Sequence, residues 1–396
     1  MKKILFVIPT MRMGGAEQSL VSLLNAIESK KYDIDLLLFE KNGELIDRLP
    51  NNINIIEADT LTRAMTLEFR HYFKDLIKEK YFLSAIMRIV MLINSKLEDL
   101  TGKKIFFNWN IAKRVVKKLS GQYDVAVGYL EGITNAYIID KVDAKRKIGW
   151  IHTDFRKSSR HFKAEGSYYK KLDQIVIISE ECRKHFIDYY PDVKGKTIVV
   201  ENITDRNAVF SKSKEEVDEK FLNALPIITT VGRLERVKGI DLAIEAASIL
   251  RNRNINFSWH VFGDGFLKDE LQRRINDLKL QEYFSLDGIT QNPYKYMRCS
   301  DIIVQPSRNE GKSMVLDEAK FLAKPIVVTN YPSAEDQIVN NITGIIVEIT
   351  PTAIADGIEM LLKDQLLREK LSENCKNEPD ITEMIVKKVE SMLEGE

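Results

Sequence analysis

The chain has 396 residues and a formal net charge of +1 at pH 7, with 44% hydrophobic and 30% charged residues. This length predicts two domains, because a single hydrophobic core stops growing well before that size. The composition excludes an intrinsically disordered chain, and no stretch has the roughly 18 uninterrupted apolar residues of a membrane-spanning helix.

Two features bear on where the protein resides. The start of the chain superficially resembles a signal peptide, but its apolar run Ile4–Ile8 is short and meets Pro9, so we interpret it as the first β-strand. The cysteines are odd in number and fit no metal-ligand pattern, which indicates free thiols in a reducing compartment. They are Cys182, Cys299 and Cys375. We therefore expect a cytoplasmic protein.

Short runs rich in Val, Ile and Leu alternate with helical stretches along the chain. The predicted strands of the first half are Lys3–Ile8, Asp33–Phe39, Ile53–Glu57, Asp124–Tyr129, Lys147–Ile151, Gln174–Ile178 and Thr197–Glu201. Those of the second half are Ile227–Val231, Phe257–Phe262, Tyr283–Leu286, Asp301–Val304, Pro325–Thr329 and Gly344–Val347. Continuous apolar runs are typical of parallel strands covered by helices on both faces. The pattern, found twice, predicts an α/β protein with two Rossmann-like doubly wound domains facing a cleft.

The predicted domains are residues 1–205, residues 206–378 and a closing helix within 379–396. A polar stretch at 211–216 lies near the boundary between the last strand of one half and the first strand of the other. After Pro379, apolar residues recur at helical spacing. We expect this last helix to pack back on the first domain.

The two halves of the chain differ in charge. Residues 1–200 hold 34 Lys and Arg against 25 Asp and Glu, a balance of +9, and the remainder therefore carries −8. Much of the excess lies in 61–120, where 13 basic residues face 5 acidic ones. There, apolar residues are interleaved with Arg and Lys at helical spacing. Two interpretations stay open: extra helices with solvated basic faces, or a basic amphipathic surface that lies on anionic lipid.

A glycine pair follows the first strand, which ends at Ile8. Gly14 and Gly15 precede a helical run, so backbone amides and the positive end of a helix can approach an anionic ligand there. The pair lacks the G-x-G-x-x-G spacing of a dinucleotide-binding loop. Glu40, just after the second strand, could still hold a ribose, so an NAD-binding alternative remains open at this point.

The second half carries two cations in a comparable loop. Its first strand leads into Gly232-Arg233-Leu234 and then Lys238-Gly239, followed by a helix that we expect Asp241 to cap. Arg233 and Lys238 lie at the carboxyl end of a sheet, where α/β folds bind ligands. A guanidinium and an ammonium suit a diphosphate, although two exposed surface charges would look the same in sequence.

The most specific pattern is Glu310-Gly311-Lys312-Ser313, which leads into a helix that contains Glu318. Amides of Gly311 to Ser313 at a helix entry would point at an anion. Glu310 and Glu318 are spaced so that one carboxylate can reach a sugar ring and the other a ribose, because carboxylates accept hydrogen bonds from paired hydroxyls. A surface helix with two glutamates is the plain alternative.

Taken together, these motifs resemble the retaining glycosyltransferases of family 4, which have the two-domain GT-B fold. The resemblance covers nearly the whole chain and includes Gly14-Gly15-Ala16-Glu17, Gly232-Arg233-Leu234 with Lys238-Gly239, Phe262-Gly263-Asp264-Gly265, the Glu310 and Glu318 pair, and Pro325–Asn330. The glutamate pair in its Glu-Gly and Glu-Ala context is specific, whereas each glycine loop alone is not.

The resemblance implies roles for residues of the second domain. Arg233 and Lys238 would neutralise the leaving diphosphate, Glu318 would hold the nucleotide ribose, and Glu310 would position the donor sugar. The loop that contains Gly263, together with Gly311, Lys312 and Ser313, would complete the donor site. Lys312 departs from the family pattern, in which many relatives have an apolar residue; its side chain would either add charge at the phosphate or point to solvent.

The resemblance also implies roles for the first domain. Gly14 and Gly15 would bring backbone amides to the phosphate. His152 follows a strand end in Trp150-Ile151-His152-Thr153-Asp154 and would lie beside the transferred sugar. A packed loop histidine is its alternative interpretation.

The expected activity is metal-independent transfer of a hexose-type sugar. We expect no cofactor and no metal site: the nucleotide diphosphate sugar, with a UDP-sugar favoured, is the donor substrate. The acceptor is expected to be a saccharide carried on a polyprenyl pyrophosphate, reached through an anionic membrane surface that 61–120 contacts. A soluble sugar or protein acceptor is the variant, and no nucleic-acid partner is expected.

Three other functions compete with this one. A sugar-nucleotide epimerase of the same fold would interconvert donors without an acceptor. An NAD-linked oxidoreductase requires the glycine fingerprint that the chain lacks. A catalytically silent binding module is expected to have lost Arg233, Lys238 or one of the two glutamates, and all four are present.

Overall fold

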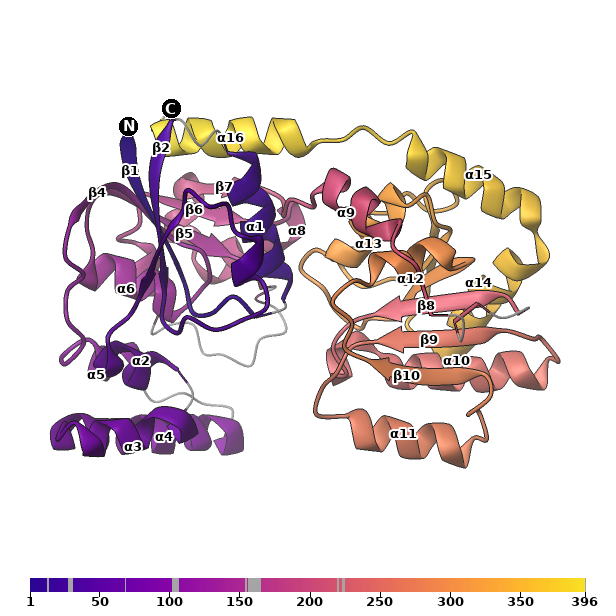
Figure 1. Ribbon diagram of the computed structural model, residues 1–396, viewed down its shortest axis with the longest axis horizontal. Helices are drawn as coiled ribbons and strands as arrows, with labels where there is room; N and C mark the ends of the chain where they lie inside the picture. Colours follow the sequence, from indigo (N-terminus) through magenta and orange to yellow (C-terminus); the bar gives the residue numbers. More distant parts are fainter. Residues whose placement is uncertain are drawn as a thin grey trace. The chain divides into compact units, whose positions relative to one another are not determined.

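The chain forms two separate parallel β-sheets, each with helices on both faces (Figure 1). The computed structural model describes residues 1–12, 14–27, 31–67, 69–101, 107–153, 155, 165–218, 221–222 and 225–395. Met1–Ile203 and Glu383–Glu396 form one compact unit, here called unit 1, and Thr204–Thr382 form unit 2. Residues 68 and 102–106 of the predicted basic segment, and positions 13 and 154 of the predicted motifs, lie outside the described residues.

Unit 1 is built on a seven-stranded sheet in the order β3-β2-β1-β4-β5-β6-β7, with every neighbouring pair parallel. Its strands are β1 (Lys2–Ile8), β2 (Tyr32–Leu38), β3 (Asn54–Glu57), β4 (Gln122–Gly128), β5 (Asp143–Ile151), β6 (Gln174–Ile177) and β7 (Thr197–Val199). Its helices are α1 (Gly15–Ala26), α2 (Thr60–Thr66), α3 (Phe69–Lys78), α4 (Phe82–Thr101), α5 (Trp109–Ala112), α6 (Ile133–Lys141), α7 (Gly166–Tyr169), α8 (Glu180–Tyr189) and α16 (Thr382–Glu394), with short 3-10 turns at Ile46–Arg48 and Pro191–Lys196.

Unit 2 is built on a six-stranded parallel sheet in the order β10-β9-β8-β11-β12-β13. Its strands are β8 (Ile227–Val231), β9 (Ser258–Phe262), β10 (Phe284–Gly288), β11 (Ile302–Gln305), β12 (Ile326–Thr329) and β13 (Ile345–Val347). Its helices are α9 (Arg206–Ser213), α10 (Ile240–Asn252), α11 (Lys268–Asp277), α12 (Tyr294–Cys299), α13 (Met314–Phe321), α14 (Pro351–Lys363) and α15 (Gln365–Lys376), with a 3-10 turn at Arg236–Lys238.

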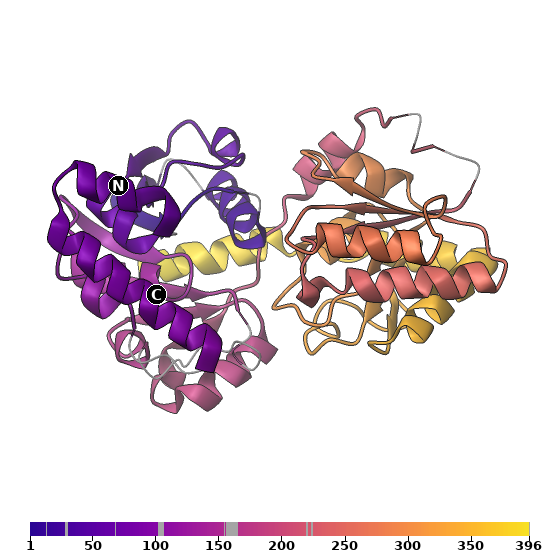
Figure 2. The same cartoon turned by 90° about the horizontal axis from the view of Figure 1, so that it is seen from below.

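The sheet of unit 2 has an apolar core on each face. One core joins the sheet to α10, α11 and α14, which lie on one side of it (Figures 1 and 2). The other core joins it to α9, α12 and α13. Ile302 and Val304 contribute to the first core and Ile303 to the second, because successive side chains of a strand point to opposite faces. Burial on both faces explains the continuous apolar runs.

These sheets confirm the predicted fold class, since each predicted strand is present. The largest difference is at β5, which was expected to begin at Lys147 and instead begins at Asp143. Its first residues are polar and partly exposed, and they extend the pairing with β4 through Gln122 and Asp143. The prediction relied on apolar runs and therefore missed this end of the strand, whose mostly polar residues lie at the edge of the core.

The last helix, α16, belongs to unit 1 rather than to the unit that precedes it in sequence. Val389, Met392 and Leu393 are buried in it. Lys2 Nζ lies 2.7 Å from a carboxylate oxygen of Glu394, and Arg146 donates a hydrogen bond to the carbonyl of Met392. The helix therefore completes the core of unit 1.

Glycines allow the strand ends of unit 2 to approach each other closely. Gly263, after β9, has a φ of +153°, and a Cβ atom there would lie 1.9 Å from the carbonyl oxygen of Gly232. A Cβ at Gly232 itself would make only ordinary contacts with the side chain of Lys238, at 3.6 Å and beyond.

We expect Gly263→Ala to destabilise unit 2 by about 2–4 kcal/mol, because the methyl group would collide with backbone that cannot move aside. The check is the melting temperature of unit 2, measured by calorimetry. Gly232→Ala is the matched control in the same contact, and it should leave the melting temperature nearly unchanged. Equal effects of the two substitutions would contradict the steric argument.

Candidate functional site

The candidate donor site is built at the carboxyl ends of β8, β9 and β11 in unit 2. After β8, the backbone amide of Leu234 donates to the carbonyl of Asp264, and the amide of Gly232 donates to the carbonyl of Phe262. These bonds fix the loop that carries Arg233 against the loop that carries Gly263. Ligands of doubly wound folds bind at this edge of the sheet.

A second pair of loops is held together at Gly239. This residue has a φ of +67°, and a Cβ atom there would lie 1.9 Å from the carbonyl oxygen of Pro306, which follows β11. Arg308 reinforces the contact with two hydrogen bonds to Asp241, each 2.7 Å long. Asp241 was expected to cap α10, and this was wrong: the cap position is Gly239, and Asp241 lies in the first turn. Its carboxylate is held mainly by Arg308, with further hydrogen bonds from the backbone amides of Asp241 and Leu242.

This ion pair sets the charge state of Asp241. Burial alone would raise the pKa of Asp241, but the hydrogen bonds and the positive charge of Arg308 outweigh it, so the pKa lies below its usual value. The carboxylate is therefore ionised at neutral pH. A bidentate arginine–carboxylate pair is geometrically rigid, which makes it suitable for fixing one loop to another.

Lys238 and Glu310, two of the predicted site residues, are in contact. Lys238 Nζ lies 2.7 Å from Glu310 Oε1, with 19% and 12% of the two side chains exposed. Gln305 Nε2 and Ser307 Oγ also donate to Oε1, at 3.0 and 2.6 Å. Three donors thus converge on one oxygen, and among the described residues no hydrogen bond reaches Oε2. The carboxylate is held in one orientation with one oxygen available.

Arg233 is not drawn into this cluster. Its guanidinium pairs with Glu235 at 2.8 Å, and 65% of its side chain is exposed. A surface pair of this kind contributes little to stability and exchanges partners readily. Arg233 can therefore turn toward an anion at the same loop without disrupting the core.

Glu318 lies in a different environment from Glu310. It sits in α13, it is 3% exposed, and it accepts a 3.2 Å hydrogen bond from the hydroxyl of Tyr294. Burial raises its pKa to about 8, while the Tyr294 hydrogen bond acts in the opposite direction. In the ligand-free protein this carboxyl group is therefore mostly protonated at pH 7.

The start of α13 differs from expectation in two respects. The amide of Ser313 was expected to face an anion, but it donates to Gln337 Oε1 at 2.7 Å, and Gln337 donates back to the Ser313 carbonyl at 2.8 Å. Lys312, for which a solvent-facing position was one interpretation, has a side chain only 6% exposed and lies 3.4 Å from Asp317. It therefore neutralises a carboxylate beside the helix.

The predicted residues of unit 1 lie at two strand ends. Gly14 precedes α1 and occupies its N-cap position, and Gly15 is the first residue of the helix. A Cβ at Gly14 would lie 2.2 Å from a carboxylate oxygen of Glu17. The absence of a Cβ at Gly14 therefore leaves room for the Glu17 carboxylate beside the start of α1.

His152 follows β5. Both of its ring nitrogens are shielded from solvent and have no hydrogen-bond partner among the described residues. Burial lowers its pKa to about 4, while the carboxylate of Glu131 and the backbone of Tyr129 act to raise it. Glu131 accepts a 3.0 Å hydrogen bond from the backbone amide of His152. At neutral pH the imidazole is neutral, with polar atoms that a ligand can satisfy.

Several supporting residues were not found from the sequence. Tyr294, Arg308 and Gln337 each hold a predicted site residue or its loop, but they are separated from their partners by 24 to 67 residues. Local patterns carry no signal for such pairs. A metal site is also not evident: among the described residues, no three His, Cys, Asp or Glu side chains gather to hold an ion.

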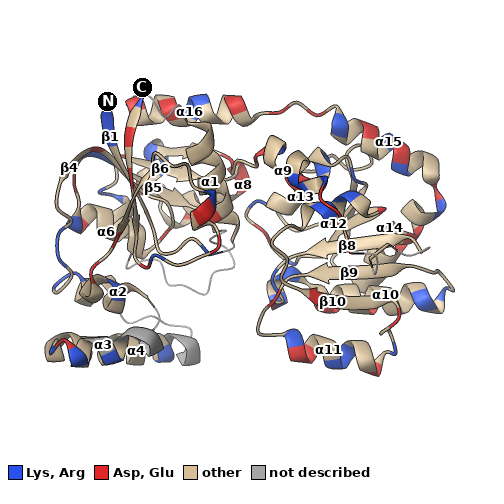
Figure 3. Ribbon diagram, viewed as in Figure 1, with Lys and Arg blue, Asp and Glu red and all other residues tan. Residues whose placement is uncertain are grey.

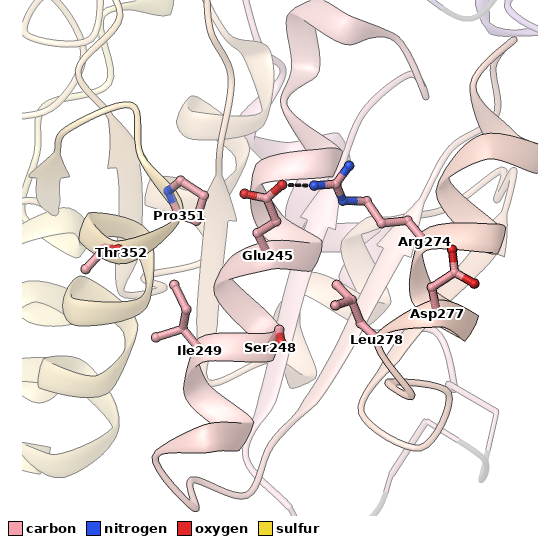
Figure 4. Close-up of a pocket in the computed structure, with 8 residues that line it drawn as sticks. All are labelled: Glu245, Ser248, Ile249, Arg274, Asp277, Leu278, Pro351 and Thr352. Carbon is pink, nitrogen blue, oxygen red and sulfur yellow. Dashed lines mark hydrogen bonds and ion pairs between the residues drawn. The ribbon is translucent and has the colours of Figure 1, made fainter.

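One surface hollow of unit 2 lies away from these residues (Figure 4). It is lined by α10, α11 and the start of α14, and Arg274 and Glu245 point toward each other across it as an ion pair. None of the predicted donor-site residues lines it. We therefore assign it no role in the chemistry.

Comparisons with known proteins show what the chain is similar to. Residues 211–378, which contain the candidate donor site, match the family model of glycosyl transferases group 1. A glycosyltransferase of Rickettsia africae has the same fold, with a TM-score of 0.68 over 100% of this chain and 98% of that one, at 18% identity. The second half of the chain is therefore similar to glycosyl transferases group 1, and the structural likeness shows a shared two-domain fold.

Curated relatives differ in how much of the chain they match. An uncharacterized glycosyltransferase of Methanocaldococcus jannaschii is 29% identical over 41% of this chain, and the match spans 41% of that relative's length. An N-acetylgalactosaminyltransferase of Campylobacter jejuni, named for a diphospho-undecaprenol-linked acceptor, is 24% identical over 95% of this chain and 94% of its own.

We expect Glu318→Gln to stabilise unit 2 increasingly as the pH rises from 5 to 8. The folded-state pKa of about 8 lies above the ordinary value of 4.5, so in this range the folded protein holds a proton that the unfolded chain releases. Stability present at low pH is therefore lost as the pH rises, by about 1.4 kcal/mol per pH unit for one proton. Glutamine does not titrate and escapes this loss.

The measurement is the difference in melting temperature between variant and wild type at pH 5 and at pH 8. Glu282→Gln, an exposed glutamate of the same unit, serves as the control and should show no such pH dependence. A Glu318→Gln effect that is constant between the two pH values would show that Glu318 is ionised in the folded protein.

Proposed function

We propose that the protein is a retaining glycosyltransferase that transfers a hexose-type sugar from a nucleotide diphosphate sugar to a saccharide acceptor in glycan or polysaccharide assembly. The observation that carries this proposal is the cluster at the carboxyl ends of β8 and β11, where Lys238 meets an oriented Glu310 with one free oxygen. The match of residues 211–378 to glycosyl transferases group 1 supports it.

In this proposal the donor diphosphate lies at the loop after β8. Arg233 leaves Glu235 for a phosphate oxygen, and Lys238 bridges Glu310 and the diphosphate. Both cations stabilise the negative charge that develops on the leaving nucleoside diphosphate, without a metal ion. Glu310 Oε2 accepts a hydrogen bond from a hydroxyl of the donor sugar and fixes its orientation.

The nucleotide ribose binds Glu318 in this scheme. The two hydroxyls of a ribose replace Tyr294 as hydrogen-bond donors, and they favour the ionised form of the carboxylate. His152 remains neutral at physiological pH, and we propose that it hydrogen-bonds the transferred sugar. The amides at Gly14 and Gly15 contribute to phosphate binding from unit 1.

The acceptor is proposed from the relatives. The Campylobacter jejuni protein is named for a lipid-linked diphospho-undecaprenol acceptor, and we propose an acceptor of the same polyprenyl pyrophosphate class. A UDP-sugar is the favoured donor, which agrees with the UDP and glucose bound by a protein of the same fold, Anabaena HepE, at a TM-score of 0.71 and 16% identity.

The first test is calorimetric titration with UDP, GDP, ADP and dTDP in the presence of EDTA. We expect one nucleotide to bind, with affinity reduced about 10- to 100-fold in Arg233→Ala, because a charge-assisted hydrogen bond is lost. Arg236→Ala removes the same charge from the same loop and should bind nearly as tightly as wild type. Failure of the folded protein to bind any nucleotide would overturn the proposal.

Incubation with the corresponding nucleotide-sugar, with and without acceptor, followed by product analysis, separates transfer from the alternatives. A nucleotide-sugar that binds but is isomerised without acceptor would indicate an epimerase, and binding with no turnover would indicate a silent module. With an active acceptor, a retaining enzyme gives an α-linked product from an α-linked donor. A β-linked product would exclude retention.

Nucleotide binding is further expected to release a proton near pH 7. Since the pKa of Glu318 is about 8 without ligand, binding to its ionised form must displace the proton, and affinity should rise with pH until about pH 8. The check is the binding enthalpy in two buffers of different ionisation enthalpy. Glu318→Gln should abolish this buffer dependence, and an affinity that falls with rising pH would contradict the assignment.

A further inference from the structure

The helix α4 buries a mixed face and exposes an apolar one. The face toward the rest of unit 1 carries Ser84 and Asn94, which are 4% and 2% exposed. Asn94 donates a 2.8 Å hydrogen bond to Asn108, and Arg88 donates to the backbone carbonyl of Leu67. The inner face thus combines these polar contacts with the buried side chains of Ala85 and Met91.

The outer face of α4 is apolar and exposed. Seven large apolar side chains, spaced at helical intervals, form what we call the α4 stripe, with exposed fractions between 36% and 63%. They are Phe82, Leu83, Ile86, Ile89, Val90, Ile93 and Leu97. Residues at this spacing share one face of a helix. Single exposed apolar residues are ordinary, but a contiguous row of this kind marks an interaction surface.

Cations flank the α4 stripe. Lys78 and Lys80 are exposed just before its first residues, and Lys96 is exposed beside Leu97 at its other end. Figure 3 shows Lys and Arg on α3 and α4. Lys74 and the apolar Ile77 are exposed on α3, which packs against α4, and Glu79 is the one described acidic residue between the two helices. The described side chains are therefore apolar in the middle of this surface and mostly basic at its ends.

We propose that α4 lies in the headgroup region of an anionic lipid bilayer, with the α4 stripe toward the acyl chains and the lysines at the level of the phosphates. A helix with this distribution binds at the interface of a membrane without crossing it. Among the described helices, none is both long enough and sufficiently apolar to span a bilayer. This inference does not depend on nucleotide binding or transfer.

A second copy of the chain fits the surface less well. Pairing of two α4 stripes would bury the apolar residues but would bring Lys78, Lys80 and Lys96 of one copy close to the same lysines of the other. Like charges at the edge of an apolar contact oppose association. Anionic lipid supplies both the apolar phase and the opposite charge.

The test is flotation of the full-length protein with vesicles of phosphatidylcholine, with and without added phosphatidylglycerol. We expect binding to the anionic vesicles, weakened at high salt, and reduced at least about tenfold in the triple variant Ile86→Ser/Ile89→Ser/Ile93→Ser. The variant Lys78→Gln/Lys80→Gln/Lys96→Gln should bind anionic vesicles less tightly than wild type, with no change for vesicles of phosphatidylcholine only. Leu366→Ser/Met384→Ser, which removes exposed apolar side chains elsewhere, should bind like wild type.

The proposal would be overturned if the wild-type protein did not bind anionic vesicles, or if the triple serine variant bound them as well as wild type. It would also be overturned if the wild-type protein formed a dimer that did not bind vesicles and that the triple serine variant converted to monomers. Circular dichroism and UDP titration of each variant separate this surface from the donor site. Intact nucleotide affinity with lost flotation supports the proposal. Flotation of a protein that binds no nucleotide would support it too, while the proposed transferase function would fail.

Discussion

The candidate donor site depends on one contact between two loops. Gly239 approaches the carbonyl of Pro306 so closely that no side chain fits, and Asp241 and Arg308 lock the same loops from residues 67 positions apart. Because of this contact, Lys238 and Glu310 come within 2.7 Å. The glycine supplies the positive φ, the ion pair supplies rigidity, and the site chemistry follows from the resulting geometry.

The cations of this site already have anionic partners before a ligand arrives. Lys238 is paired with Glu310, Arg233 with Glu235, and Lys312 with Asp317. Binding of a diphosphate to such a site exchanges one anion for another instead of neutralising bare charges. The gain in free energy then depends on how well the new partner fits, which favours selectivity over raw electrostatic attraction.

The fold could be predicted because parallel strands buried on both faces leave continuous apolar runs, and the loops at their ends carry the glycines and charges. The site could be predicted only in part. A separation of eight residues places Glu310 before a helix and Glu318 within it, but it carries no information on burial, which gives the two carboxyl groups different protonation states. For α4, periodicity indicates a helix, but it does not show which side of the helix is exposed. The burial of Ser84, Met91 and Asn94 shows which face is inside.

The return of α16 to unit 1 has a consequence for synthesis of the chain. A ribosome that has completed residues 1–203 has made every strand of the first sheet, but not the helix whose Val389, Met392 and Leu393 complete its core. Unit 2 can therefore finish folding while unit 1 still exposes the apolar seam that α16 covers. The unit that is translated first is thus the last to complete its core. The exposed seam is prone to non-native apolar contacts until α16 has been made.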